Sequence, residues 1–525
     1  MKKKYYILIS FTAVALASIS CNDFLSELPD NRAEIDSPEK IRKILVSAYP
    51  AKSYIMCTEL SSDNVDFYGE RNPNGNRFMD ELYNWRDVTE VDNESPAGIW
   101  STCYDAIASA NQALQAIEEL GDTEATRYSK GEALICRAYA HFILTNVFCQ
   151  HYHPTWSETD LGIPYMEKPE TELAPKYERP SVAYDYEKMA ADIEAGLPLI
   201  NDTQYDIPKY HFNRKAAYTF ASRFYLYYQQ WDKVIAYASV ALGAAPQTML
   251  RDNKFLGSQP QDYLSPVSQV YTRADETANL LLITAVSELG LVFGNWSYGS
   301  RYSHGNLIAS TETIQSTGPW GAYTRDNTFY SPPWKYSSTN MDKVLLPRLP
   351  YLFEYTDPVA QIGYRRTVYA ALTVEEALLN RAEAYIMKKN YAAAYADMKL
   401  WVDNTVKTGA NLVTEAKIES WVGGIRYFSP EQPTQKKTLA PSGFTIDDEK
   451  QEKFIHFLLY IRRHETLHMG LRWFDVKRYG ITVTRRTIEY GETTVTNNVL
   501  VPRDPRCAIQ IPADVVAAGF TPNPR

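Results

Sequence analysis

Two stretches of the chain repeat the same alternation of small and large side chains at a constant offset. The matched residues are Ala217, Tyr225, Trp231, Ala236 and Val240 in the first stretch and Ala377, Tyr385, Tyr391, Ala396 and Leu400 in the second. An alanine at a helix contact lets two helices approach closely, while a bulky aromatic side chain fills the groove beside it. The repeat therefore predicts antiparallel helix pairs, either as copies of one unit or as two unrelated pairs.

Apolar residues recur at three- and four-residue steps elsewhere in the chain. This spacing predicts helices over 99–150, 182–199 with 214–244, 374–408 and 452–478. About four helix pairs are enough for a stacked array, and their small-large alternation resembles tetratricopeptide repeats. We expect a mainly α fold of tetratricopeptide-like helix pairs with few short strands.

Two segments, 56–92 and 245–357, lack this periodicity and are rich in Gly, Pro, Ser, Asn and aromatic residues. Both are too long for simple connections, and loops of that length usually carry function. We expect these segments to form a large, loop-rich, irregular face that binds ligand. The helices and this face would make one body over residues 21–525.

The length and composition exclude several classes of protein and one class of partner. At 525 residues the chain exceeds the commonest domain size, so it forms two domains or one extended array. A hydrophobic content of 45% with 22% charged residues excludes a disordered chain and a polytopic membrane protein. The formal net charge of -9 would repel phosphate backbones, so no nucleic-acid partner is expected. Tyr outnumbers Phe by 39 to 19, which favours aromatic surfaces that face water.

Residues 1–20 have the features of a secretory signal peptide. Lysines follow Met1, an apolar run extends from Tyr5 to Ala17, and small residues precede Cys21. The run is too short to span a bilayer. The position of Cys21 resembles a bacterial lipobox, although Ser18 stands where that box usually carries Leu. We expect a lipid on Cys21 that tethers the body to a membrane; an ordinary signal peptide or an N-terminal anchor helix is the alternative.

The sequence His464-Glu465-Thr466-Leu467-His468 fits the H-E-x-x-H zinc pattern when it lies on a helix. On a helical wheel, however, His468 falls within the apolar stripe, so we interpret it as a core residue. No extended third-ligand motif follows. We expect no metal, no cofactor and no catalytic residue, and the remaining cysteines, without a C-x-x-C pair, predict no disulfide framework.

The same helical stripe places Glu465, Arg472 and Asp475 among apolar neighbours. Buried charges must be paired, because an unpaired one costs several kcal/mol. We expect their partners on other helices and name Arg381 or Glu383 as the candidates.

Several segments resemble the SusD/RagB family of Bacteroidetes surface lipoproteins. The match is clearest in Arg462-Arg463-His464-Glu465 and the following Gly470-Leu471-Arg472-Trp473-Phe474-Asp475. It extends, in order, over most of the mature chain, including Gly162-Ile163-Pro164 and Ile511-Pro512. Ile461, His468 and Met469 depart from the usual family residues.

The resemblance implies a fold, a function and a partner. Members of this family are built on four tetratricopeptide-like helix pairs with a loop-rich second face that captures oligosaccharides. They cap a SusC-like TonB-dependent barrel in the outer membrane. The resemblance thus predicts a surface-exposed, lipid-anchored protein of the cell outer membrane that binds a glycan, delivers it to the barrel and is not an enzyme.

Sugar sites need flat aromatic rings for the C–H faces, and amides or charges for the hydroxyls. The irregular segments supply both kinds of side chain. The candidate ligand-binding residues are Asp63, Arg71, Trp85 and Asp92 in the first segment and Trp296, Tyr298, Trp320, Tyr323 and Trp334 in the second. Each tryptophan could instead pack inside its own loop, and Asp63 with Arg71 could form a surface ion pair.

Two other functions remain open at this point. The helical array could bind a polypeptide, as tetratricopeptide-like proteins do. The chain would then be a peptide-binding surface lipoprotein. A hydrolase is disfavoured because neither a G-x-S-x-G motif nor a P-loop occurs, although paired carboxylates could still serve one.

Overall fold

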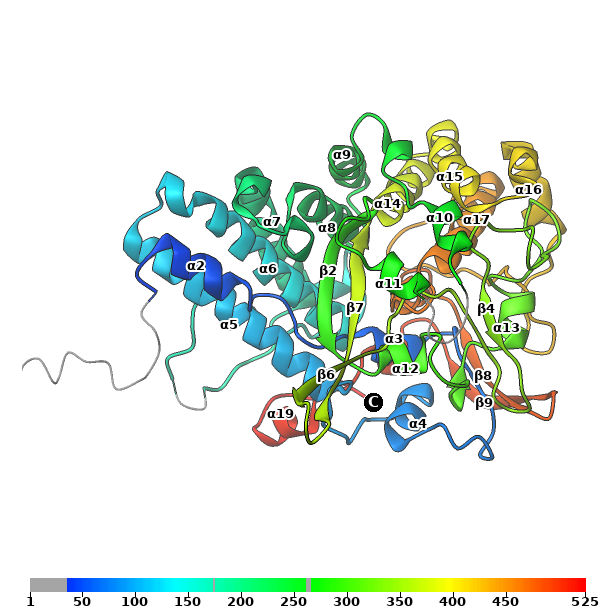
Figure 1. The fold of residues 1–525 in the computed structure, drawn as a ribbon, viewed down its shortest axis with the longest axis horizontal. Coiled ribbons are helices and arrows are strands. Elements are labelled where there is room, and N and C mark those ends of the chain that lie inside the picture. Colours follow the sequence, from blue (N-terminus) through cyan, green and yellow to red (C-terminus); the bar gives the residue numbers. More distant parts are fainter. Residues whose placement is uncertain (1–34, 173–174, 261–265) are drawn as a thin grey trace, which may run out of the picture.

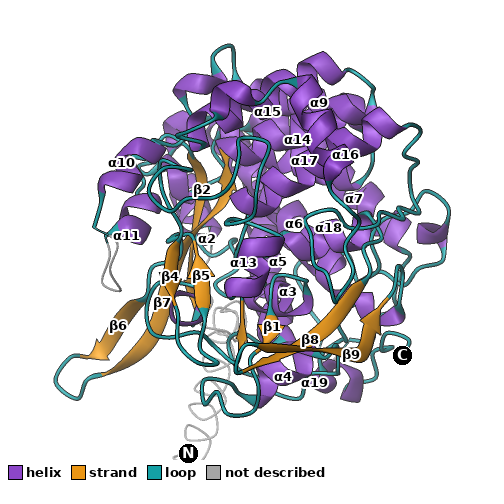
Figure 2. Cartoon of the chain, turned by 90° about the vertical axis from the view of Figure 1, so that its right-hand side faces the viewer, coloured by secondary structure: helices purple, strands orange, loops and turns teal. Residues whose placement is uncertain are grey.

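The computed structural model describes residues 35–172, 175–260 and 266–525. The helices between residues 96 and 196 lie on the left of the body in Figure 1, and those between residues 391 and 465 lie on its right. Sheets and loops lie together along one edge of both groups, as Figure 2 also shows. The prediction of a mainly α fold is confirmed.

The principal helices run antiparallel in neighbouring pairs. Their bounds are α2 Pro38–Leu45, α3 Ile55–Ser61, α4 Arg77–Tyr83, α5 Pro96–Leu120, α6 Glu124–Phe148, α7 Val182–Gly196, α8 Arg214–Tyr227, α9 Trp231–Leu242, α14 Val374–Met387, α15 Tyr391–Thr405, α16 Glu415–Gly424, α17 Glu449–Glu465 and α18 Arg472–Arg478. In space, α5, α6 and α7 pack in that order, α8 packs on α9, and α14 lies against α9, α15 and α17. The predicted hairpins at 99–150 and 374–408 are therefore present.

The two repeated stretches lie side by side, because α9 of the first packs against α14 of the second. Ala217 and Ala377 are fully buried, as the repeat predicts. Ala236 and Ala396, however, are exposed, so the predicted contact at these two positions is wrong. On the second helix of each pair the buried face is shifted, and it consists of Val234, Ala238, Ala241, Ala394, Met398 and Trp401.

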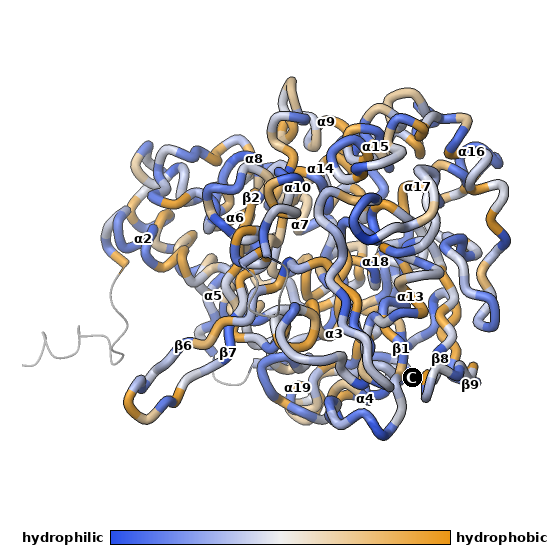
Figure 3. The backbone as a smooth tube through the Cα atoms, turned by 45° about the vertical axis from the view of Figure 1, so that its right-hand side comes forward, coloured by the Kyte–Doolittle hydropathy of each residue, from blue (hydrophilic) through white to orange (hydrophobic). Residues whose placement is uncertain are grey.

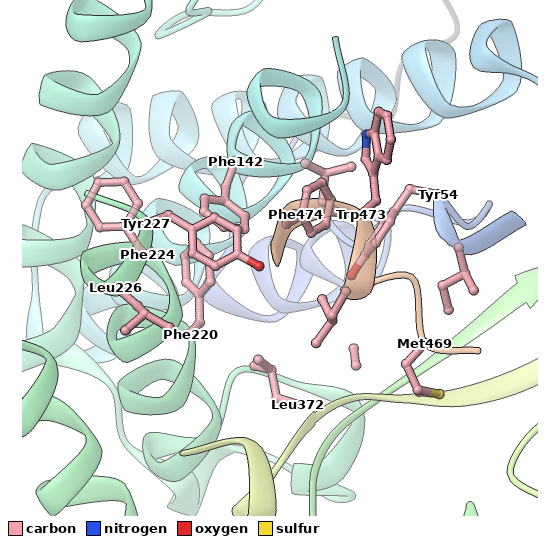
Figure 4. Packing of buried hydrophobic residues seen from close by; sticks show 14 of the residues in the cluster. Tyr54, Phe142, Phe220, Phe224, Leu226, Tyr227, Leu372, Met469, Trp473 and Phe474 are labelled. Atoms are coloured by element: carbon pink, nitrogen blue, oxygen red, sulfur yellow. The ribbon is translucent and has the colours of Figure 1, made fainter. Parts of the chain in front are cut away.

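Aromatic side chains fill the space between the early helices and the C-terminal helix α18. The ring centroids of Phe142 in α6 and Phe220 in α8 are 5.6 Å apart, and those of Phe474 in α18 and Tyr227 in α8 are 5.8 Å apart. Tyr54 packs on the other side of Phe474 at 5.9 Å. Figure 4 shows how these rings from distant parts of the sequence meet in one core.

Three small sheets complete the body. Their strands are β1 Asp66–Phe67, β2 Asn279–Val286, β3 Tyr302–Ser303, β4 Trp334–Tyr336, β5 Lys343–Leu345, β6 Leu352–Asp357, β7 Ile362–Thr373, β8 Val483–Glu489 and β9 Glu492–Leu500. The strand orders are β3-β1-β8-β9, β2-β7-β6 and β4-β5. Most are short, as expected, but β7 is 12 residues long.

The segment 245–357 contains more regular structure than its composition indicates. It includes β2, which pairs antiparallel with β7 beyond the segment, and short helices at Asn253–Ser258 (α10), Val267–Tyr271 (α11), Leu289–Val292 (α12) and Asn306–Thr311 (α13). Each element is too short to give a clear periodic signal, which is why the sequence pattern reads as irregular.

The predicted helix over 452–478 is interrupted. Helix α17 ends at Glu465, and α18 begins at Arg472. Between them His468 and Gly470 have φ values of 64° and 76°, which end the helix because right-handed helices need negative φ. His468 is therefore buried as predicted, at 3% exposure, but it does not share a helix with His464.

Five cysteines lie in the described residues, and all are buried and free: Cys57, Cys103, Cys136, Cys149 and Cys507. Burial raises the pKa of the Cys57 thiol well above its ordinary value, which keeps the group protonated and unreactive. These cysteines behave as small core residues. Cys21 lies outside the described residues.

Glu383 of α14 binds two arginines from the last two helices. Its carboxylate pairs with Arg462 of α17 and Arg478 of α18, and it accepts a hydrogen bond of 2.7 Å from the hydroxyl of Tyr479. Burial would raise the pKa of Glu383, but the two guanidinium groups outweigh burial and lower it to about 2. Glu383 therefore reaches the C-terminal helices, but its partners are Arg462 and Arg478; the prediction that it pairs with Arg472 is wrong, because Arg472 binds Asp63.

The other predicted partners pair differently. Arg381 pairs with Asp397 of α15, with Nη2 to Oδ1 at 2.7 Å, and so lies outside this group of charges. Glu465 accepts a hydrogen bond of 2.9 Å from the indole of Trp401 and lies 3.7 Å from Arg348. Asp475 lies 3.3 Å from Arg462, so the buried charges on these helices are paired as expected.

A second group of buried charges attaches the irregular face to α17 and α18. Arg472 binds Asp63 in bidentate fashion at 2.7 and 2.9 Å, and Arg463 donates to the backbone oxygen of Asp63 at 2.6 Å. Glu312 is fully buried and lies 3.3 Å from Arg463 and 2.9 Å from Arg486 of β8. Two loops far apart in sequence are thereby fixed to the same helix.

Replacing Glu383 by Gln is expected to lower the free energy of unfolding at pH 7 by about 3–5 kcal/mol, because two buried arginines lose their anion. The folded pKa is near 2 and the ordinary value is 4.5, so this stabilisation is complete above pH 4.5 and is lost as pH falls toward 2. Urea unfolding at pH 7 and pH 4 measures both effects. Glu354→Gln, at an exposed ion pair, should cost less than about 1 kcal/mol; equal losses for the two variants would contradict the prediction.

Candidate functional site

An exposed cluster of aromatic rings lies where segments of the irregular face meet. Trp296 stacks on Tyr351, with ring centroids 4.9 Å apart and planes inclined by 14°. Tyr298 lies 4.9 Å from Tyr336, and the ring of Tyr336 is nearly parallel to that of Trp334 at 6.4 Å. Tyr298 is 53% exposed, and the other four are half-buried. We call these five residues the aromatic platform.

Lys343 is buried and connects the segment of Trp296 and Tyr298 to the hairpin that carries Trp334 and Tyr336. It is the cross-strand partner of Tyr336, and its Nζ donates to the backbone oxygens of Leu291 at 3.1 Å and Trp296 at 3.3 Å. The residue is 2% exposed. Burial lowers the pKa of its ammonium group to about 7. One buried side chain thus ties the strand of Tyr336 to the backbone of Trp296.

The backbone around the platform is strained at three residues. Ser297, Asn340 and Tyr490 have φ values of 69°, 57° and 54°, which side-chain-bearing residues rarely adopt. Gly299 permits a close approach nearby, because a Cβ there would lie only 2.4 Å from the backbone oxygen of Asp342. Such strain concentrates at functional sites, where the surrounding structure holds it.

Polar groups form one edge of the platform. Asn72 donates through Nδ2 to the backbone oxygens of Asn340 at 2.7 Å and Gly299 at 3.3 Å. The backbone N–H of Tyr490 donates to Oδ1 of Asn340 at 2.8 Å. Arg71 hydrogen-bonds the Tyr490 hydroxyl and lies 5.2 Å from its ring centroid. We call Arg71 and Tyr490 the polar rim. A guanidinium group and a hydroxyl group are thus available beside the rings, whereas the amide of Asn72 is buried and already paired.

The structure brings together part of the predicted site. Trp296, Tyr298 and Trp334 are members of the platform, and Arg71 lies in its polar rim. The predicted ion pair between Asp63 and Arg71 is absent, because Asp63 binds Arg472 in the interior and is 8% exposed. Burial would raise the pKa of Asp63, but Arg463 and Arg472 hold it well below the ordinary value. Asp63 is a structural residue.

Two predicted tryptophans are also buried. Trp85 is 5% exposed, its indole N–H donates to the backbone oxygen of Ser61 at 2.8 Å, and Arg485 lies 4.1 Å from its ring. Trp320 is 5% exposed and stacks on Tyr460 of α17 at 5.7 Å. Both rings pack within the body, so neither can face a ligand in this conformation.

The remaining two predicted residues lie outside the platform. Tyr323 is half-buried and packs beside Phe329 at 6.2 Å. Asp92 is exposed, and its carboxylate accepts a hydrogen bond of 3.1 Å from the backbone N–H of Glu94 in the turn before α5. This contact shapes the start of the helix and does not extend to the aromatic platform.

Four residues of the site escaped the sequence analysis. Tyr336 and Tyr351 lie in the predicted ligand-binding segment but were not singled out among its many tyrosines. Tyr490 and Asn340 meet only because the β8–β9 turn folds against the 340 loop. The sequence Glu489-Tyr490-Gly491 does indicate a hairpin turn, but the contact across 150 residues leaves no sequence signal.

A deeper groove of about 350 Å³ lies elsewhere, between α5, residues after Pro164 and the C-terminal segment. Its walls include Trp100, Tyr104 and Phe520. Asn111, a polar wall residue, already donates to the backbone oxygen of Met166 at 2.9 Å. The Tyr104 hydroxyl likewise donates to the backbone oxygen of Pro164 at 3.0 Å. This mostly apolar groove is less suited than the platform to a hydroxyl-rich ligand.

The helices in the described part of the chain include none that is both long and apolar enough to cross a bilayer. Among the described residues, groups of three or more His, Cys, Asp or Glu side chains that could hold a metal ion do not occur either. His464 instead packs against Trp401 at 5.3 Å and Phe329 at 4.6 Å. The H-E-x-x-H string is thus part of the core.

Comparisons with known proteins identify a matching family model and solved structures with the same fold. Residues 23–226 match a SusD-like family model described as "Starch-binding associating with outer membrane". A SusD superfamily protein from Bacteroides thetaiotaomicron matches with a TM-score of 0.62 over 93% of this chain and 100% of the relative, at 17% identity. The chain shares the fold of that structure. No curated protein matches the chain.

Other solved structures share this fold. A SusD-like carbohydrate binding protein from Bacteroides vulgatus has a TM-score of 0.62 and 14% identity, and covers 92% of this chain and 96% of its own. A SusD superfamily protein from Bacteroides fragilis has a TM-score of 0.60 and 17% identity, over 92% and 98%. The matched family region ends at the end of α8, and the structural matches extend the same fold over the later helices.

Lys343→Met is expected to change how the free energy of unfolding depends on pH. Between the folded pKa near 7 and the ordinary value of 10.5, the unfolded chain binds a proton that the folded chain does not. The wild-type free energy of unfolding should therefore rise relative to the variant between pH 7 and pH 10. The expected rise is a few kcal/mol, at about 1.4 kcal/mol per pKa unit.

Urea unfolding at several pH values measures this difference. Lys335→Met serves as the control, because Lys335 lies on β4 of the same hairpin and is exposed. If the difference in free energy of unfolding between the wild type and Lys343→Met stays constant with pH, Lys343 is not a buried lysine that loses its proton on folding, and the prediction is wrong.

Proposed function

We propose that this protein is a cell-surface lipoprotein that binds oligosaccharides and delivers them to a SusC-like TonB-dependent transporter in the outer membrane. The observation that carries the proposal is the aromatic platform with its polar rim. The description of the matching family model as starch-binding supports it, as does the carbohydrate-binding description of the Bacteroides vulgatus relative.

The platform has the chemistry that a sugar requires. Pyranose rings present apolar C–H faces that stack on flat aromatic side chains, and their hydroxyls need planar donors and acceptors at the edge. Tyr298 and Tyr336 offer the exposed faces. Arg71 and the Tyr490 hydroxyl lie beside them. Lys343 holds the rings in place before a ligand arrives, which reduces the entropy lost on binding.

Binding without bond cleavage is the activity we propose for this site. The alternative of a peptide-binding protein would use the helical array, but the exposed rings belong to the irregular face and not to the helix seams. Incubation with each bound oligosaccharide should release no new reducing ends. Measurable release would bring back the hydrolase interpretation.

Tyr298→Ala and Tyr336→Ala are each expected to weaken oligosaccharide binding by about tenfold, or roughly 1.4 kcal/mol, because each removes a stacking surface. Calorimetric titration with a panel of oligosaccharides, beginning with α-1,4-glucans, measures the loss. Tyr184→Ala is the matched control, since Tyr184 is a 40% exposed tyrosine on helix α7. If an oligosaccharide binds saturably and neither Tyr298→Ala nor Tyr336→Ala weakens the binding, the sugar site does not lie at the aromatic platform.

The membrane anchor is the second part of the proposal. Cys21 lies outside the described residues, and the expected acyl chains would hold the body at a membrane at about 0.8 kcal/mol per buried CH₂. Cys21→Ser should abolish incorporation of radiolabelled palmitate and release the protein from the membrane fraction. The unsubstituted chain should incorporate the label and co-purify with a large TonB-dependent barrel; palmitate incorporation that is unchanged in the serine variant would contradict the anchor.

A further inference from the structure

The β6–β7 hairpin projects from the body as an isolated two-stranded arm. Figures 1 and 2 show it extending past neighbouring elements, and Figure 3 shows apolar residues at its tip. Every residue from Glu354 to Ile362 is exposed. The exposed large apolar side chains on the arm are Phe353, Tyr355, Val359, Ile362 and Tyr364. A soluble body rarely leaves such a group uncovered without an interaction to serve.

The side chains are ordered by depth along the arm. Val359 at the tip is 96% exposed and Ile362 beside it is 61% exposed. The next rows carry the tyrosines, since Tyr355 pairs with Gly363 and Tyr364 with Glu354. The arginines follow nearer the body, where Arg365 pairs with Phe353. From the tip toward the body, the arm thus carries aliphatic residues, then tyrosines, then arginines. Proteins at a lipid–water interface show the same order.

Three polar backbone groups at the tip are satisfied by side chains of the arm. The carboxylate of Asp357 accepts hydrogen bonds from the N–H groups of Val359 at 2.9 Å and Ala360 at 3.0 Å. The hydroxyl of Thr356 donates to the backbone oxygen of Ile362 at 3.1 Å. This matters because an apolar layer offers no replacement partners to N–H and C=O groups.

The charges near the base of the arm are neutralised in pairs. Arg365 pairs with Glu288, and Arg366 pairs with Glu354 across the hairpin. Asp357 near the tip takes part in neither pair. The charged side chains of the arm, Glu354, Asp357, Arg365 and Arg366, nevertheless sum to zero, whereas a surface that selects a charged protein partner would carry a net charge. A neutral, apolar-tipped arm fits a neutral lipid surface better.

We propose that the β6–β7 hairpin inserts its tip, Val359 and Ile362 foremost, into the headgroup region of a lipid bilayer. Tyr355 and Tyr364 then lie at the level of the headgroups, and the arginine pairs stay in water. Interfacial insertion reaches about 5–10 Å, so the open edge of β6 stays largely in the hydrated layer. This contact is separate from the proposed sugar site.

The expected lipid on Cys21 would assist this contact without being required for it. The chain between Cys21 and the first described residue, Ile35, can reach at most about 50 Å when fully extended, at up to about 3.6 Å per residue. A body tethered so closely meets the bilayer repeatedly, which allows a weak hairpin contact to form.

The test uses the chain from Asn22, which retains every described residue and cannot be acylated. Because the described cysteines are all buried, Val359→Cys can be labelled selectively with an environment-sensitive nitrobenzoxadiazole dye. Phosphatidylcholine vesicles should shift its emission to the blue. The same dye at Val240→Cys, an exposed valine on α9, is the control and should not respond.

Flotation of the unlabelled chain with the same vesicles gives an independent measurement. Val359→Asp combined with Ile362→Asp should abolish flotation, whereas Val240→Asp should leave it unchanged, with equal melting temperatures for all variants. The proposal is overturned if the dye at residue 359 does not respond, or if flotation survives the double substitution. It is also overturned if the double substitution instead dissolves a dimer seen by size-exclusion chromatography, which would assign the arm to a second copy of the chain. Loss of sugar binding has no bearing on these results.

Discussion

The paired charges buried beneath α17 and α18 hold the two halves of this molecule together. Arginine side chains from one short C-terminal stretch reach a carboxylate on α14 and another in the loop after α3. Removing such ions from water costs several kcal/mol each, so each must find its partner for the fold to be stable. This requirement fixes the loops in one place, where apolar contacts alone would tolerate several arrangements.

The position of the candidate site follows from this constraint. Asp66 binds Arg486 at 3.0 Å, which sets β1 beside β8. Strand β1 also pairs with β3, close in sequence to Tyr298, while β8 leads to the turn at Tyr490. The rim and part of the platform are thus held by one small sheet, and that sheet is held by buried charges. A flexible set of loops acquires the rigidity that a binding surface needs.

Two exposed surfaces in the described part of the chain differ in chemistry. The platform has a guanidinium group and a hydroxyl group at its edge and suits a hydroxyl-rich ligand. The β6–β7 hairpin projects from the body with exposed apolar side chains at its tip, where three backbone groups are paired within the arm, and suits an apolar layer. The first surface carries the proposed sugar binding, and the second carries the proposed bilayer contact.

The sequence by itself determined the helical class, the burial of Glu465, Arg472 and Asp475, and the segment that carries Trp296, Tyr298 and Trp334. These features are encoded locally, because helical periodicity and the cost of unpaired charge act on short stretches. Only the tertiary structure decided that Asp63, Trp85 and Trp320 face inward and that Tyr490 faces the platform. Whether a loop aromatic is covered depends on which distant segment packs over it, and a residue's own neighbours in the sequence do not carry that information.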